Sequence, residues 1–162
     1  MHDIYEELGK LAARYEELHS LFRDFYKAGV PLLTGGSVRG IEVSPLVEDR
    51  YFDVTCAGTT ARFAFVFLGD ELKARVTCVR LNPPNGLEPS WLESVGHFDF
   101  NGEGVVDEIK MPKGSFEGDR FLVGTDSHAC LLVASLLYKA STSPVSISPA
   151  EVSRRASGLT RT

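Results

Sequence analysis

The sequence lacks every motif that would mark a metal, nucleotide or acyl-transfer site. Its cysteines and histidines do not form the C-x-x-C or H-E-x-x-H spacings of zinc sites, and G-x-S-x-G is absent. The glycine-rich stretch 35–40 has neither the Gly-Lys-Ser/Thr of a P-loop nor the spacing of a dinucleotide loop. We therefore predict no metal and no cofactor. Whether the chain catalyses a reaction stays open, and a non-catalytic role is favoured.

A stripe of basic residues is also missing. The formal net charge is −5, whereas a protein that binds nucleic acid neutralises phosphates with clustered Lys and Arg. The only basic excess lies in 141–162, so the remainder of the chain is more acidic than the whole. We predict no nucleic-acid partner.

No apolar run is long enough to cross a bilayer. The longest, 129–138, is about half of the roughly 20 residues required, and the acidic N-terminus differs from the basic start of a signal peptide. The three cysteines, an odd number without metal-ligand spacing, are typical of a reducing compartment. These features predict a cytoplasmic protein with no membrane partner.

The stretch 51–81 contains three runs rich in β-branched and aromatic residues, separated by glycines, and the two outer runs alternate apolar and polar residues. Such alternation is typical of strands, because successive side chains point to opposite faces of a sheet. We predict antiparallel strands at about 50–57, 60–68 and 71–81. The middle run is apolar on both faces, which predicts a central strand covered on both sides.

Near the N-terminus, apolar residues recur at alternating intervals of four and three. This spacing predicts an amphipathic helix over 3–28, ended by Gly29 and Pro31. The stripe fits either the concave face of a sheet, which is favoured, or a second copy of the same helix. Its predicted interface residues are Leu8, Leu11, Tyr15, Leu18, Phe22 and Phe25.

The remaining chain predicts several shorter elements and a second helix at 125–140. That helix is apolar around most of its circumference, so we expect it to be buried nearly all round. The shorter elements are an edge strand at 40–44, one helical turn at 89–94, a hairpin of strands 95–100 and 105–111, and a strand at 120–123.

Together these elements predict an α+β fold. It consists of a long N-terminal helix, a curled antiparallel sheet of about five to seven strands and a buried C-terminal helix. Residues 1–140 form a single domain. Residues 141–162 form a Ser/Thr-rich tail, in which a capping-box pattern predicts a short helix near 149–157.

Two clusters offer reactive side chains. His97 and Asp99 share one face of a predicted strand, an arrangement that suits a general base or the start of a metal site. Asp126, Ser127, His128 and Cys130 form the second cluster, at the start of the second helix. Asp126 and Cys130 share a face near the positive helix end, a place that lowers the pKa of a thiol, whereas His128 lies on another face. Neither cluster contains a complete site, and structural roles are the favoured interpretation of both.

Two functions follow, in order of preference. The first is a non-catalytic cytosolic binding protein of the adaptor, chaperone or inhibitor type, homodimeric through its apolar helices, because these helices carry more apolar surface than one sheet covers. The alternative is a small-molecule cup, or a small enzyme, with an apolar pocket between the sheet and the second helix. Its predicted lining is Phe63, Phe65, Phe67, Trp91, His97, Asp99, His128 and Tyr138.

Overall fold

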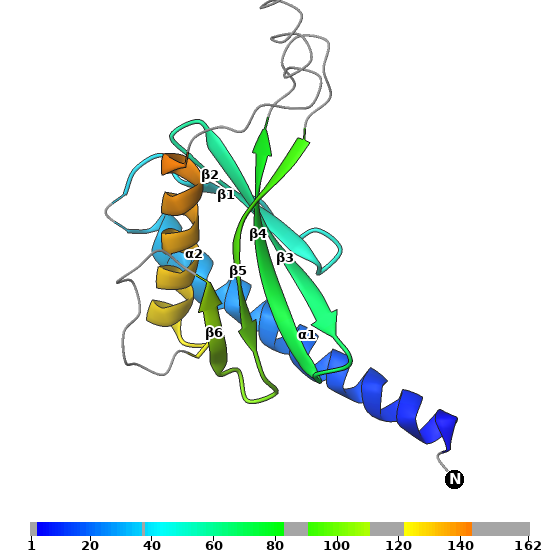
Figure 1. Cartoon of the computed structure of the whole chain (residues 1–162). Coiled ribbons are helices and arrows are strands. Elements are labelled where there is room, and N and C mark those ends of the chain that lie inside the picture. Colours follow the sequence, from blue (N-terminus) through cyan, green and yellow to red (C-terminus); the bar gives the residue numbers. More distant parts are fainter. Residues whose placement is uncertain (1–2, 37, 83–90, 111–121, 144–162) are drawn as a thin grey trace, which may run out of the picture.

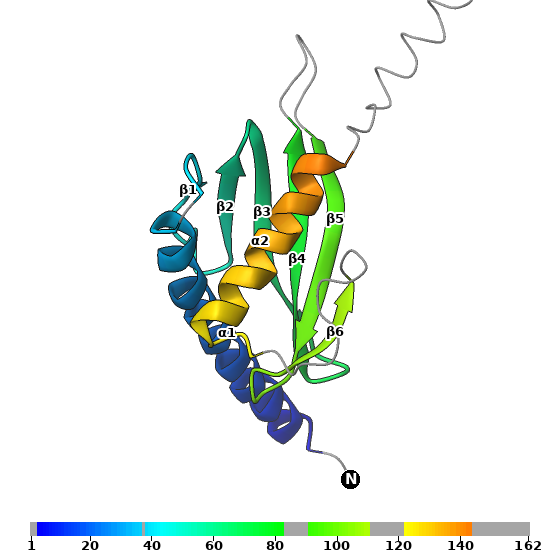
Figure 2. The ribbon, with the colours of Figure 1, turned by 90° about the vertical axis from the view of Figure 1, so that its left-hand side faces the viewer.

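A long N-terminal helix, six antiparallel strands and a C-terminal helix follow one another along the chain (Figure 1). The computed structural model describes residues 3–36, 38–82, 91–110 and 122–143. Both helices lie on the same face of the sheet, α2 across its middle and α1 along one side (Figure 2). This arrangement confirms the predicted α+β fold, with a helix at each end of a single sheet.

The strands form one sheet in their order along the chain, β1-β2-β3-β4-β5-β6, and every neighbouring pair is antiparallel. The three central strands of the predicted meander are all present. The elements are α1 (Ile4–Thr34), β1 (Glu42–Val43), β2 (Tyr51–Cys56), β3 (Thr59–Leu68), β4 (Lys73–Asn82), β5 (Trp91–Phe100), β6 (Val106–Lys110) and α2 (Asp126–Thr142).

The first helix is longer than the sequence predicts, and the expected stop at Gly29 is wrong. Asp3 caps the N-terminus, where its carboxylate accepts the Tyr5 N–H at 3.0 Å. The helix passes through Pro31 and ends at Thr34, with the Gly35 N–H donating to the Pro31 carbonyl. Gly29 instead lies within the helix and packs against α2, where a Cβ would be in ordinary van der Waals contact with the backbone of Ala129, at 3.4 Å.

The predicted helical turn at 89–94 is also wrong, because the chain from Trp91 is strand β5. A ten-residue β4 needs a partner along its whole length, and β5 pairs with it out to Asn82 opposite Trp91. One irregularity, between Cys78 and Val79, interrupts the register. The predicted strand at 120–123 is reduced, within the described residues, to a single bridge between Val105 and Leu122.

Aromatic rings from α1 and the sheet make up the centre of the core. Phe52 and Phe63 stack on neighbouring strands with their centroids 5.3 Å apart, and Phe25 meets Phe98 edge to face at 5.4 Å. All four rings are fully buried. Burying a side chain of this size contributes about 1.5–3 kcal/mol, so this cluster fixes α1 on the sheet.

Two expectations about burial do not hold. α2 is not buried nearly all round, since Leu131 is 44% and Tyr138 is 69% exposed. The predicted cover on both faces of β3 is also absent among the described residues. Both helices lie on the Phe63 face of the sheet, and Val66 on the other face is exposed.

A buried arginine fastens the end of α2 to the sheet. Arg80 of β4 is 4% exposed and donates to the carboxylate of Glu93 on β5 at 2.6 Å. The same guanidinium donates to the carbonyls of Ala140 and Ser143, at 2.8 Å each. It therefore satisfies helix-end carbonyls and places a positive charge at the negative end of the helix.

Replacing Arg80 by alanine should destabilise the fold by about 3 kcal/mol, because it leaves a largely buried carboxylate and two carbonyls without their donor. Arg62→Ala is the matched control. Arg62 also pairs with a carboxylate across the strands, that of Asp53, but on the open face of the sheet, so its loss should cost about 1 kcal/mol or less. Urea unfolding of both variants measures the difference, and equal losses would contradict the assignment.

Candidate functional site

The N-terminal third of α1 extends beyond the sheet. Figure 1 shows this part of the helix, drawn in dark blue, projecting past the turn between β3 and β4. Three of its large apolar residues are exposed in this chain: Ile4 by 62%, Tyr5 by 81% and Leu8 by 55%. We call residues 3–14 the projecting segment. Exposed apolar side chains gathered on one element are typical of an interaction surface.

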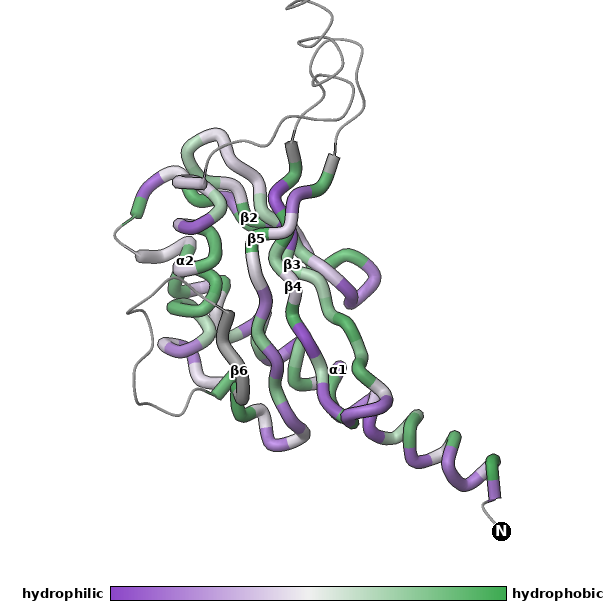
Figure 3. The backbone as a smooth tube through the Cα atoms, in the orientation of Figure 1, coloured by the Kyte–Doolittle hydropathy of each residue, from purple (hydrophilic) through white to green (hydrophobic). Residues whose placement is uncertain are grey.

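Figure 3 shows apolar and polar residues alternating along this part of α1. Charges in the projecting segment are also ordered along the helix. Asp3, Glu6 and Glu7 come first, and Lys10 and Arg14 follow one and two turns later. The acidic residues lie near the positive end of the helix dipole and stabilise it. The segment is therefore negative at its start and positive at its end.

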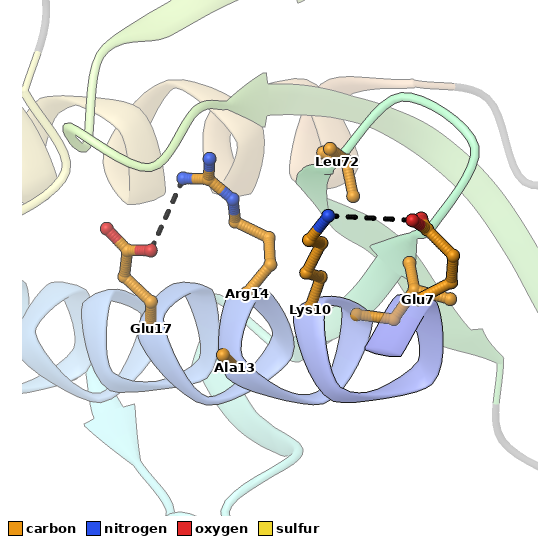
Figure 4. Close-up of a pocket in the computed structure, with 7 residues that line it drawn as sticks. Glu7, Lys10, Ala13, Arg14, Glu17 and Leu72 are labelled. Carbon is orange, nitrogen blue, oxygen red and sulfur yellow. Dashed lines mark hydrogen bonds and ion pairs between the residues drawn. The ribbon is translucent and has the colours of Figure 1, made fainter. Parts of the chain in front are cut away.

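A hollow of about 390 Å³ borders the projecting segment (Figure 4). Leu11 and Leu72 supply its apolar surface, and charged side chains surround them. Within this rim, Lys10 pairs with Glu7 at 3.5 Å and Arg14 pairs with Glu17 at 3.3 Å. The full lining is Glu7, Lys10, Leu11, Ala13, Arg14, Glu17 and Leu72.

The turn between β5 and β6 positions Arg14. In this turn, the side chain of Asn101 accepts the N–H groups of Glu103 and Val105, at 3.0 and 3.1 Å. A Cβ built on Gly102 would lie 1.9 Å from a guanidinium nitrogen of Arg14. The absence of a side chain at Gly102 thus leaves the space that Arg14 occupies.

The structure divides the predicted stripe of α1 into two parts. Leu18, Phe22 and Phe25 are buried by this chain's own sheet. Tyr15 is partly buried and touches two rings of β3 edge to face, at 5.7 and 5.6 Å between centroids. Leu11 is also partly buried, and Leu8 is exposed. Only the N-terminal part of the stripe is therefore available to another molecule.

The side chains predicted to line a cup are not brought together. Phe63 is in the core, whereas Phe65 and Phe67 lie against α1. Tyr138 is 69% exposed at the far end of α2. The side chain of Trp91 lies outside the described residues.

An apolar groove does lie beside α2, although at a different place from the predicted one. It has a volume of about 440 Å³ and runs between the C-terminal half of α2 and the end of β2. Of the predicted residues, Tyr138 alone borders it. Its lining is Val38, Ile41, Cys56, Ala57, Ala134, Leu137, Tyr138, Ser141 and Thr142.

Asp99 is held in an ion-pair network. Arg75 on β4 donates to both of its carboxylate oxygens, at 2.7 and 3.1 Å, and Lys73 lies 3.4 Å away. Burial raises the pKa of Asp99, but the hydrogen bonds from Arg75 and Lys73 more than offset it, and the pKa is lowered. A carboxylate held in this way suits a structural role better than that of a general base. His97 stands opposite Thr77 on β4 and Lys110 on β6.

The second cluster is divided between structural roles. The Nδ1 of His128 accepts the Leu122 N–H at 3.1 Å, which ties the start of α2 to the chain before it. The position of Cys130 near the start of α2 does not make its thiol acidic, because burial raises its pKa, in agreement with the favoured structural role. Burial also raises the pKa of Cys78, to about 12. Neither thiol is thereby activated as a nucleophile.

Among the described residues, no group of three or more His, Cys, Asp or Glu is arranged to hold a metal ion. Within the same residues, neither helix combines the length and the apolar character needed to cross a membrane. No protein-family model, curated protein or solved structure matches the chain. The site is therefore interpreted from its own geometry.

Sequence reasoning missed two residues that shape these surfaces. His19 is buried beside Tyr15 and Phe65, and its ring contacts the carbonyl of Asp49 in the loop before β2. Gly102 leaves room for the side chain of Arg14, which lies 88 residues earlier in the sequence. In the sequence, the place of His19 beside the apolar stripe was the one local signal of its role. The Asn101-Gly102 turn gave no indication that Gly102 makes room for Arg14.

Replacing Asp99 by asparagine should destabilise the protein by about 1–2 kcal/mol at pH 7, because two cations lose their carboxylate. A lowered folded-state pKa contributes stability above the unfolded value, near 3.8, and this contribution is lost as the pH falls through the folded value. The difference in stability between the variant and the parent should therefore shrink as the pH falls below 3.8. Urea unfolding at a series of pH values from 7 downwards tests this, and a difference that stays constant with falling pH would contradict it.

Proposed function

We propose that this chain is a non-catalytic protein-binding module of the adaptor, chaperone or inhibitor type that works in the cytoplasm. It associates through apolar helical surface, as a homodimer. The projecting segment of α1 is the observation that supports this function most directly, since Ile4, Tyr5 and Leu8 are exposed on a rigid helix. Burying each of these side chains would contribute about 1.5–3 kcal/mol to association.

The arrangement of the described polar groups supports binding rather than catalysis. Asp99 is held by Arg75 and Lys73, and His128 by the Leu122 N–H. A catalytic pair needs a nucleophile or base within hydrogen-bond reach of its partner and facing a pocket. Neither Asp99 nor His128 lines the hollow beside the projecting segment or the groove beside α2. The three cysteines are free thiols, which agrees with a reducing compartment.

Ile4→Glu/Leu8→Glu should convert the protein from a reversible dimer to a monomer. Both side chains are already exposed, so the monomer's unfolding midpoint should change little. Sedimentation velocity at high micromolar concentration measures the association state. Leu131→Glu on α2 is the matched control, because it places the same charge on another exposed apolar residue and should leave the dimer intact. A parent protein that sediments as a monomer would refute the proposal.

A second candidate function, binding of an apolar small molecule, rests on the groove beside α2. Its lining is almost wholly apolar, with Ser141 and Thr142 near one end and the exposed Tyr138 at its border. Small-molecule sites typically combine apolar walls with a few polar groups that orient the ligand. A single alkyl chain with a small polar head would match this distribution.

Filling the groove should abolish such binding. Ala134 borders the groove from α2, so Ala134→Trp should occupy much of its volume and weaken the binding of decanoate at least tenfold, at roughly 0.8 kcal/mol for each methylene displaced. Isothermal titration calorimetry measures the affinity. Leu131→Trp, on the same helix but outside the groove, is the control. Failure of the parent protein to bind decanoate or longer alkyl acids would exclude this function.

A further inference from the structure

We propose that the projecting segment of α1 binds the same segment of a second copy, with the two helices running antiparallel. This inference rests on the self-association proposed above and specifies its arrangement. It follows from the order of charges along the segment and from the hollow beside it. The ion pairs that these charges make within α1 are exposed pairs.

The order of charges selects the direction of the pair. In an antiparallel pair, Glu6 and Glu7 of one copy lie toward the end that carries Lys10 and Arg14 in the other. Two-fold symmetry repeats this attraction at the opposite end of the contact. A parallel pair would instead place acidic beside acidic and basic beside basic residues, which is unfavourable.

The position of the hollow agrees with the same direction. At 100° per residue, Glu7 and Arg14 lie on one flank of the apolar stripe, only about 20° apart around the helix. Both border the hollow beside Leu11 (Figure 4). In an antiparallel pair each flank faces the same flank of the partner. Glu7 of one copy therefore approaches Arg14 of the second, and the hollow lies along the contact.

The ion pairs that these charged side chains make within α1 do not prevent them from pairing with a second copy. Lys10 pairs with Glu6 at 3.4 Å and Arg14 with Glu17 at 3.3 Å, and all four side chains are at least one-third exposed. Exposed pairs of this kind contribute little to stability, so changing partners costs little. Apolar contact between Ile4 and Leu8 of the two copies supplies the attraction, while the charges set its direction.

The size of the contact predicts a weak, reversible dimer. The eleven helical residues of the projecting segment extend about 16 Å. A contact of this length buries less than the roughly 1,200 Å² of surface that stable complexes need. A micromolar dissociation constant, with fast exchange between monomer and dimer, is the expected behaviour. Dissociation would then expose the segment to other protein partners, as an adaptor requires.

Paired charge reversals test the arrangement. The first variant is Glu6→Lys/Glu7→Lys and the second is Lys10→Glu/Arg14→Glu. Each variant alone places like charges opposite one another and should associate about tenfold more weakly than the parent. An equimolar mixture restores both sets of opposite charges, so its association should return to within about threefold of the parent. Sedimentation velocity and energy transfer between labelled copies provide the two measurements.

The control variant changes the net charge by the same amount as the first variant, but at positions away from the projecting segment. Asp24→Lys/Glu48→Lys alters two exposed residues away from the projecting segment and should leave the parent's association unchanged. Should lysines in the first turn unfold the helix, Glu6→Gln/Glu7→Gln should still show an intermediate weakening. Circular dichroism checks the helix in every variant.

The outcomes separate this inference from the function on which it rests. A parent protein that remains a monomer would refute the proposed homodimer. A parent that dimerises and loses its dimer with Ile4→Glu/Leu8→Glu, but tolerates both charge reversals, would overturn the antiparallel arrangement alone. A mixture that associates no more tightly than either reversed variant by itself would also overturn it.

Discussion

The close crossing of α1 and α2 is the constraint on which the rest of the structure depends. At Gly29 the two helices approach so closely that a Cβ would touch the backbone of Ala129. The two helices share one face of the sheet, and the aromatic cluster around Phe52 fixes α1 there. A helix of 31 residues is about 46 Å long. Once its C-terminal part is fixed against α2, its N-terminal third extends past the sheet.

The sequence predicted the sheet well because alternation is a local property. Strands, hairpins and their order follow from period-two patterns that each run carries by itself. The errors arose where a distant element decided the outcome. Pro89 and Trp91 suggested a helical turn, yet β4 required a partner strand along its whole length. Gly29 and Pro31 resembled a helix end, whereas burial of Leu33 extends α1 by another turn.

The sequence indicated only part of the candidate binding surface on α1. The heptad stripe indicated that α1 is amphipathic, but identical spacing continues from Leu8 to Phe22 and does not say where the sheet ends. That boundary depends on the helix crossing. The hollow is bordered by Leu72 from one distant turn, and Arg14 on its rim lies against Gly102 of another. The groove beside α2 likewise combines three separate segments, so no local pattern could indicate it.

The hydrogen bond from Arg80 to Ser143 sets a minimum length for the autonomous folding unit. The apolar periodicity of α2 ends near Ala140, which by itself suggests a domain boundary at that residue. The carbonyl of Ser143, however, is one of the acceptors that satisfy a buried guanidinium. A chain shortened to Ala140 would retain every apolar residue of α2 and still remove part of the polar shell around its own core. Polar satisfaction, rather than hydrophobic content, therefore requires the folding unit to reach at least Ser143.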